Sequence, residues 1–559
     1  MEYVILIITI IVFILAVAIK GNIDNRIEHK KFIKKIGNSF GTFSDFEITE
    51  QKMEKIKKYF SEHKEEKWVL DDITWNDSDM DDVFRQMNTC FSSAGEEYLY
   101  YMLRTPQMDE KVLNETERVV SFFADNKSVR IRFQDLYHQL GTTGKYSLYD
   151  YLNYLSNLGK RTNTMNVIAL LVIVVSIAII PFHVMTGVLL LVAILLFNII
   201  TYYRDKNVVK PYLTSFAYIL RLITMSNKVL AYAPDEFKVY KDKIAEDCKK
   251  LKRFSRNSFI TMTMGEVSSN PLDIIFDYLR MSLHIDLIKF NQMLNEIQGK
   301  KEIVDSLITT MGFLESTIVI ANYRKALGTY AIPTFGEEIG FEEMYHPLIE
   351  DAIPNDLQMK KCILLTGSNA SGKSTFLKMV SLNCILAQTI HTCTAKSAKL
   401  RLQYIYSSMK LEDSIEKKES YYMAEIRGIK RILDVAEKEK KVICFVDEVL
   451  RGTNTVERIA ASTQILKSLS KGKVICIAAT HDVELTSLLK KEYENYHFTE
   501  KIQKQDIYFS YKIKKGPAMT RNAILLLEKM GYPVELVEEA KKSAIYFMDN
   551  GTWEDNQWM

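Results

Sequence analysis

The sequence predicts an α/β domain with a parallel sheet in the C-terminal part of the chain, an all-α region before it, and transmembrane helices. From about Tyr330, short apolar runs alternate with helical segments, which is typical of parallel strands with helices on both faces. Before Thr329, long segments with few glycines or prolines indicate long helices. Uncharged apolar runs near the N-terminus and around residue 180 are long enough to cross a bilayer.

Length, charge and cysteine content narrow the class of protein. The chain has 559 residues, which is too long for one core and predicts several domains. Its 73 basic and 70 acidic residues nearly balance, so the net charge does not point to a polyanionic partner. The seven cysteines form no CxxC pair, and three of them fall in apolar, strand-like runs. This pattern argues against a disulfide framework or a zinc site and favours a reducing compartment.

A glycine-rich loop lies between an expected strand and an expected helix. Lys361 to Leu365 leads into Gly367-Ser368-Asn369-Ala370-Ser371-Gly372-Lys373-Ser374-Thr375, and Phe376 to Val380 continues as an amphipathic helix. Backbone N–H groups of such a loop close on the phosphates of a nucleotide, while Lys373 adds a positive charge and the Ser374 hydroxyl a Mg²⁺ ligand. The stretch predicts a P-loop NTPase domain.

Two further strands end in polar side chains. Val442 to Val446 runs into Asp447 and Glu448, where Asp447 suits Mg²⁺ through its water shell and Glu448 can orient or deprotonate the attacking water. Val474 to Ala479 ends in Thr480-His481-Asp482, and His481 can hydrogen-bond the γ-phosphate or the water. Alone, His481 would more often be structural, but ligands sit at the carboxyl ends of such strands. We therefore expect Lys373, Glu448 and His481 to carry the catalysis.

Two apolar blocks predict three membrane spans. Tyr3 to Ile19 carries no charge and lacks the basic start of a signal peptide, so we expect an uncleaved anchor. Val167 to Ile200 is broken near Pro181, which suits two spans joined by a short turn; the alternative is a buried soluble hairpin. Basic residues follow the first block and flank the second, so we expect a multi-pass cell-membrane protein with its N-terminus outside and its NTPase domain cytoplasmic.

Between the hairpin and the NTPase domain, basic residues gather at Lys249, Lys250, Lys252, Arg253 and Arg256, interleaved with Phe254. A contact with nucleic acid or anionic lipid is one interpretation. An ordinary solvated helix face is the other.

Beyond the loop, four stretches resemble the MutS family of DNA mismatch-repair ATPases. They are His346 to Ile349 with Ile353-Pro354-Asn355-Asp356-Leu357; Asp413 with Ser420-Tyr421-Tyr422-Met423-Ala424-Glu425-Ile426; Asp447-Glu448-Val449-Leu450-Arg451-Gly452-Thr453-Asn454-Thr455; and Thr480-His481-Asp482-Val483-Glu484-Leu485. Arg521 to Ala544 is similar to the family's C-terminal dimerising helix pair, and residues 72–125 resemble its core segment more loosely.

The resemblance implies ATP and Mg²⁺ as ligands. It also implies a homodimer in which Ser420 of one subunit contacts the γ-phosphate of the nucleotide bound to the other subunit. The other interpretation of Ser420 is an ordinary helix cap. Two departures stand out. The region before residue 72 is taken up by the expected span and linker, which leaves no room there for the family's mismatch-reading domain. The family's adenine-stacking aromatic is Ala352 here, so we expect Ile353 and Tyr511 to pack on adenine instead.

The expected organisation is a transmembrane helix (1–20), a charged helical linker (21–71), a helical core-like region (72–160), a transmembrane hairpin (165–202), a lever-like region (203–329), the MutS-like P-loop ATPase domain (330–515) and a dimerising segment (516–559).

Two functions fit this organisation. One is an ATPase that switches a DNA-binding clamp, and the other is a nucleotide-gated membrane scaffold that acts without DNA.

Overall fold

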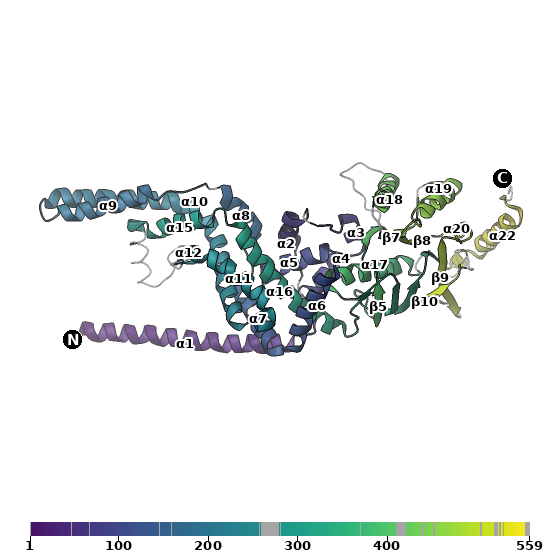
Figure 1. Cartoon of the computed structure of the whole chain (residues 1–559), viewed down its shortest axis with the longest axis horizontal. Coiled ribbons are helices and arrows are strands. Elements are labelled where there is room, and N and C mark those ends of the chain that lie inside the picture. The colour runs from purple at the N-terminus through teal and green to yellow at the C-terminus, as the bar shows by residue number, and fades with distance from the viewer. Residues whose placement is uncertain are drawn as a thin grey trace. The chain divides into compact units, whose positions relative to one another are not determined.

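The computed structural model describes residues 2–553 except 46, 66, 145, 158, 257, 259–278, 280, 369–370, 410–420, 439–440, 451–452, 504–505, 519–523, 525–526 and 529 (Figure 1). The chain divides into two compact units. Unit 1 comprises Met1–Glu66, Met87–Tyr101 and Arg118–Ala326, and unit 2 comprises Lys67–Gln86, Met102–Glu117 and Leu327–Met559. The expected helical region 72–160 is therefore shared between the two units, because two of its segments pack with the C-terminal domain.

Unit 1 is helical in its described residues. Its elements are α1 (Glu2–Asn38), α2 (Glu50–His63), most of α5 (Ser93–Arg104), the second half of α6 (Glu110–Asp125), α7 (Lys127–Leu140), α8 (Leu148–Asn157), α9 (Thr164–Ile179), α10 (Val184–Tyr232), the 3-10 turn η1 (Asp235–Phe237), α11 (Lys238–Lys250), α12 (Lys252–Ser255), α15 (Ile285–Ile297) and α16 (Lys301–Leu327). Because α1 runs unbroken to Asn38, the expected first span and the start of the expected linker form one helix.

The small residues in the first turn of α5 allow α16 to pack very close to it. A Cβ at Gly95 would lie 2.1 Å from Oε2 of Glu315, and a Cβ at Gly312 would lie 2.5 Å from the carbonyl oxygen of Ala94. The buried Glu315 accepts hydrogen bonds from the backbone N–H groups of Phe91 (2.6 Å) and Ser92 (3.2 Å). One carboxyl group thus satisfies the donors at the start of α5, which would otherwise be buried without partners.

The apolar block around residue 180 forms a helical hairpin of α9 and the first part of α10, which run side by side in Figure 1. The turn between them is tight, since a Cβ at Gly187 would lie 2.8 Å from the backbone nitrogen of Ile180. Large apolar side chains on the hairpin are strongly exposed, including Val174 at 62%, Leu189 at 59% and Ile200 at 71%. These side chains are not buried by the described part of this chain.

In the described part of the chain, two helices are long and apolar enough to cross a membrane, namely residues Val184–Val209 within α10 and α16. The two differ in burial, with 11% of the first and 72% of the second buried. Helix α9 is also apolar but shorter. Nothing is described of the side chains of residues 2–18, so the expected N-terminal span stays a prediction.

Polar side chains hold the base of the hairpin to α15. The two ring nitrogens of His284 lie 2.9 Å from Oδ1 of Asn166 on α9 and 2.8 Å from the carbonyl oxygen of Asn198 on α10. The Tyr202 hydroxyl donates to Asp286 over 2.7 Å. Because these groups are largely buried, their hydrogen bonds fix the hairpin to the helical unit rather than leave it on a flexible linker.

Unit 2 combines two sheets with helices. Its elements are α3 (Asp72–Asp77), α4 (Met80–Met87), β1 (Thr334–Phe335), β2 (Ile339–Met344), β3 (Asn355–Met359), β4 (Cys362–Thr366), α17 (Lys373–Ile390), β5 (Ser397–Leu400), β6 (Tyr404–Ser408), α18 (Tyr421–Lys438), β7 (Val442–Asp447), α19 (Thr455–Ser468), β8 (Val474–Ala479), α20 (Glu484–Leu488), β9 (Tyr493–Gln503), β10 (Asp506–Lys515) and α22 (Val534–Asn550).

The expected single parallel sheet is only partly right. Among the described residues, one sheet has the order β10-β9-β4-β8-β7-β6, in which β10 is antiparallel to β9 and the others run parallel. A second, mixed sheet has the order β1-β5-β2-β3. It was missed because its strands are short and half-exposed, without the continuous apolar runs that mark β4 and β7.

The strand register places three loops at one edge of the larger sheet. Leu365 of β4 pairs with Ala479 of β8, which in turn pairs with Asp447 of β7. The segments that follow these strands begin at Gly367, Glu448 and Thr480. They therefore emerge together at the carboxyl ends of parallel strands, where ligands of such sheets bind.

The segment 67–86 packs on β6 at the border of this sheet. The Trp68 indole donates to the Tyr406 hydroxyl over 3.1 Å. Asp77 accepts hydrogen bonds from the Ser407 hydroxyl (2.6 Å) and the Met409 backbone (2.9 Å). These buried bonds explain why a segment far away in sequence belongs to unit 2.

Candidate nucleotide site

The start of the loop Gly367–Thr375 binds the amino group of Lys373. Its Nζ donates to the carbonyl oxygens of Gly367 and Ser368, each over 2.8 Å, and the side chain is buried. Gly372 precedes α17 with a φ of 103°. Ser371 is buried and Thr375 faces the neighbouring pocket, while Asn369 and Ala370 lie outside the described residues.

The two residues expected to hold Mg²⁺ meet. The Ser374 hydroxyl donates a hydrogen bond to Oδ2 of Asp447, which joins the start of α17 to the end of β7. Within the described residues, no group of three or more His, Cys, Asp or Glu side chains could hold a metal by itself. One hydroxyl and one carboxylate fit Mg²⁺ nevertheless, since this ion keeps several waters and takes its remaining ligands from phosphates.

Glu448, His481 and Lys373 also converge. Nε2 of His481 lies 2.7 Å from Oε1 of Glu448 and 3.4 Å from Nζ of Lys373. Arg458 on α19 makes a two-pronged ion pair with Asp482, with distances of 2.9 and 2.6 Å, beside His481. The structure thus brings the three expected catalytic side chains together, and their roles stay predictions.

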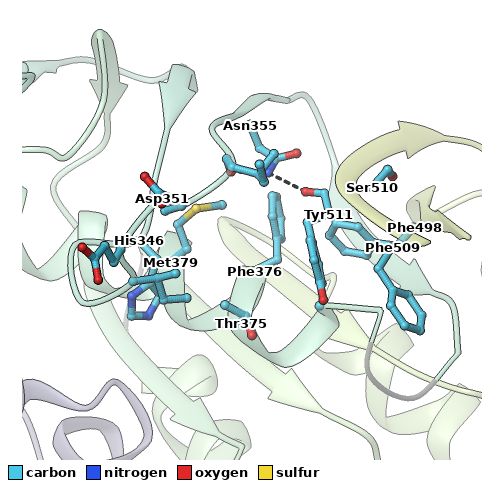
Figure 2. Close-up of a pocket in the computed structure, with 15 residues that line it drawn as sticks. His346, Asp351, Asn355, Thr375, Phe376, Met379, Phe498, Phe509, Ser510 and Tyr511 are labelled. Carbon is cyan, nitrogen blue, oxygen red and sulfur yellow. Dashed lines mark hydrogen bonds between the residues drawn. The ribbon is translucent and has the colours of Figure 1, made fainter. Parts of the chain in front are cut away.

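A cavity of about 640 Å³ opens beside the loop (Figure 2). Ile353 and Tyr511, which we expected to pack on adenine, both line it, and so does Ala352. The sequence did not predict that the cavity would also be lined by other large side chains, among them His346, Asn355, Phe376, Met379, Phe498 and Phe509. Phe376 and Met379 could have been found, because they follow the loop at helical spacing on one face of α17.

Backbone irregularity turns Tyr511 into the cavity. The β9–β10 register shifts between Phe509 and Ile513, and Tyr511 has a φ of 49°. The side-chain amide of Asn355 donates to the Tyr511 carbonyl oxygen over 2.9 Å and accepts from the Ile513 N–H over 2.9 Å (Figure 2 shows the first). A Cβ at Gly372 would lie 3.2 Å from Cδ1 of Tyr511, so the ring lies directly against the loop.

His346 gives the cavity a neutral polar group. Burial, the main cause, lowers the pKa of His346 from 6.5 to about 4. The imidazole is therefore uncharged near neutral pH, and the cavity wall on this side adds no positive charge.

Some expected contacts fall elsewhere. Ser420 lies outside the described residues. In unit 1, the basic residues around Phe254 are exposed, but Phe254 itself is fully buried and packs edge-on against Phe216, 5.3 Å between ring centroids. Phe254 is thus a core residue and not a platform for stacking a base or a lipid.

A mixed α/β sheet with a glycine-rich loop, two carboxylates and a histidine at the carboxyl ends of its parallel strands has the arrangement of an ATPase-type domain. The family model for MutS domain V matches residues 363–547, which contain all of these groups. Residues 363–547 are therefore similar to domain V of the MutS family.

The matched relatives carry MutS names. The chain is 32% identical over 217 residues to the DNA mismatch repair protein MutS of Thermus thermophilus, which covers 38% of this chain and 26% of the relative. It is 30% identical over 343 residues to that of Finegoldia magna, covering 58% and 39%, and 28% identical over 282 residues to human MutS protein homolog 4, covering 47% and 30%. The chain therefore spans about a quarter to two fifths of these relatives.

Proposed function

We propose that this protein is a membrane-anchored ATPase that binds and hydrolyses ATP as a dimer and couples this cycle to DNA binding. The observation that carries the ATPase proposal is the meeting of Lys373, Glu448 and His481 beside a cavity of nucleotide size. The match of residues 363–547 to MutS domain V supports the same activity.

Each group then has a defined task. The base enters the cavity against Tyr511 and Ile353, and the loop N–H groups with Lys373 bind the phosphates. Bound between Ser374 and Asp447, Mg²⁺ would neutralise charge on the phosphates. Glu448 orients the attacking water and accepts its proton, and His481, 2.7 Å away, holds that carboxylate in place.

A second copy of this chain is the proposed dimer partner. Helix α22 and the residues after it expose large apolar side chains, including Val534 at 76%, Ile545 at 55% and Trp553 at 66%. Such a surface costs free energy in water unless another surface covers it. The resemblance of this segment to a dimerising helix pair favours a second copy.

The membrane proposal rests on the hairpin of α9 and α10. Both helices expose large apolar side chains, and they carry no charged residue between Val167 and Thr201. Lys160 and Arg161 precede it, and Arg204 and Lys206 follow it, as expected where anionic headgroups begin. Tyr203, half exposed, stands at the same end, where aromatic residues are enriched in membrane proteins.

DNA binding has less support than hydrolysis, and the scaffold without DNA remains the second candidate. The burial of Phe254 favours the scaffold, because the exposed basic residues beside it then lack an aromatic partner for bases. Non-specific phosphate contacts by these basic residues would still allow salt-sensitive DNA binding.

The test uses detergent-solubilised full-length protein. Wild type should hydrolyse Mg-ATP, Lys373→Ala should bind no nucleotide, and Lys360→Ala, which removes an exposed lysine near β3, should match wild type. Binding to homoduplex, mismatched and branched DNA is then measured with and without ATP across a salt series. Wild type that does not hydrolyse ATP would contradict the ATPase proposal. If the protein hydrolysed ATP but bound no DNA at low salt, the membrane scaffold that acts without DNA would be the supported function.

A further inference from the structure

The loop after β7 has an unusual backbone. Glu448 has a φ of 63° and Leu450 a φ of 61°, although neither is glycine. Such left-handed conformations are disfavoured for residues with a Cβ, and they persist only where surrounding contacts hold them. This conformation sets the direction in which the Glu448 carboxylate leaves the end of the strand.

Contacts from three neighbouring elements hold this loop. The Glu448 N–H donates to the carbonyl oxygen of Ala479 at the end of β8 over 2.9 Å. The Ser462 hydroxyl on α19 donates to the carbonyl oxygen of Val449 over 3.2 Å. The Leu450 N–H donates to Oε1 of Glu425 on α18 over 2.5 Å. Glu425 is only 5% exposed and Leu450 only 7%, so water cannot easily replace this last bond.

We propose that Glu425 is a positioning residue that helps to hold Glu448 and Leu450 in their left-handed conformations and so aims Glu448 at the attacking water. This inference rests on the proposed ATP hydrolysis. In this inference Glu425 acts through its hydrogen bond with the Leu450 N–H. Without it, the buried N–H loses its acceptor, and the loop can relax to an ordinary backbone conformation that turns Glu448 away from His481.

The same bond links Glu448 to the start of α18. Helix α18 begins at Tyr421, directly after Ser420, and Glu425 lies about one turn along it. Farther along, Ile429 and Ile432 pack in one core cluster with Val449 and Leu450. A ligand or partner that moves the start of α18 would therefore also move the Glu425 carboxylate, which accepts the hydrogen bond from the Leu450 N–H. The rate of ATP hydrolysis would then depend on binding at the start of α18.

The experiment compares Glu425→Ala, Glu425→Gln and Glu437→Ala in the full-length protein. Gln keeps a carbonyl acceptor for the Leu450 N–H, and Glu437 is an exposed glutamate on the same helix that serves as the matched control. We expect Glu425→Ala to lower kcat about tenfold or more with little change in KM or ATP affinity, since a positioning bond of this kind is felt in the reaction step. Glu425→Gln should recover most of the rate, and Glu437→Ala should match wild type.

Two further readouts separate this role from a general loss of structure. In a Glu448→Gln background, Glu425→Ala should cause no further loss of rate, because its effect passes through Glu448. Hydrogen exchange should rise in peptides that cover 448–450 in Glu425→Ala but not in Glu425→Gln, whether or not the protein hydrolyses ATP. The inference would be overturned if Glu425→Ala left both kcat and the hydrogen exchange of residues 448–450 unchanged. It would also be overturned if Glu425→Gln lost as much activity as Glu425→Ala. Inactive wild type would instead contradict the proposed function, and exchange alone would then decide whether Glu425 holds the loop.

Discussion

Nε2 of His481 lies 2.7 Å from Oε1 of Glu448, although the two residues follow different strands. The contact joins the ends of β8 and β7, which pair in register at Asp447 and Ala479. It places the imidazole ring between a carboxylate and the amino group of Lys373, 3.4 Å away. We therefore expect changes at either residue to affect turnover more than nucleotide binding.

Glu448→Gln should keep ATP bound and slow hydrolysis by about two to four orders of magnitude, the usual contribution of a positioned general base. A single-turnover assay with labelled ATP measures the chemical step, and a filter assay measures retained nucleotide. If Glu448→Gln turned over ATP at the wild-type rate, Glu448 would have no catalytic role.

Tyr511→Ala should weaken ATP binding by about 1–3 kcal/mol, the range for stacking of one base on an aromatic ring, because Tyr511 lines the cavity against Gly372. Tyr511→Phe keeps the ring and should bind ATP nearly as well as wild type. Titration of a fluorescent ATP analogue measures both affinities. Equal binding by Tyr511→Ala and wild type would place the base elsewhere.

The buried Glu315 should make folding stability depend on pH. Burial, its largest cause, raises the pKa of Glu315 from 4.5 to about 8. Because the folded state then holds this proton more tightly than the unfolded chain, the stabilisation is complete below pH 4.5 and is lost as pH rises towards 8. The slope is at most about 1.4 kcal/mol per pH unit.

Glu315→Gln should flatten this slope, because its amide oxygen can still accept the bonds from Phe91 and Ser92 without titrating. Denaturant unfolding of the full chain between pH 5 and 8 measures the slope. Glu302→Gln, an exposed change at the start of α16, is the control. An equal slope in wild type and Glu315→Gln would show that Glu315 does not titrate in this range.

The hairpin should lie in lipid. A fluorophore at Leu189→Cys, on α10, should be quenched by bromine on lipid acyl chains and protected from aqueous iodide in proteoliposomes. A fluorophore at Val239→Cys, which is 77% exposed on α11, should behave in the opposite way. Iodide quenching of both positions alike would mean that the hairpin stays in water.

Local patterns predicted much of the ATPase-type domain. Three features were predicted correctly: the loop Gly367–Thr375, the strand that ends at Asp447 and the strand Val474–Ala479. They could be predicted because apolar runs and glycine spacing depend on the backbone conformation of residues close together in sequence. The second sheet and the antiparallel β10 were missed, since short half-exposed strands leave no comparable pattern. The buried position of Phe254 was missed as well, because its partner Phe216 lies on another helix.

By itself, the sequence determined which chemical groups are present and which of them follow strands, because loops and strand ends depend on neighbouring residues. Only the tertiary structure decided which distant groups meet. It brought Tyr511 against Gly372 through a bulge in β10, Asp77 against β6, and Glu425 against the Leu450 N–H. The physical reason is that these contacts depend on packing between elements and on the burial of donors and acceptors, which no local spacing encodes.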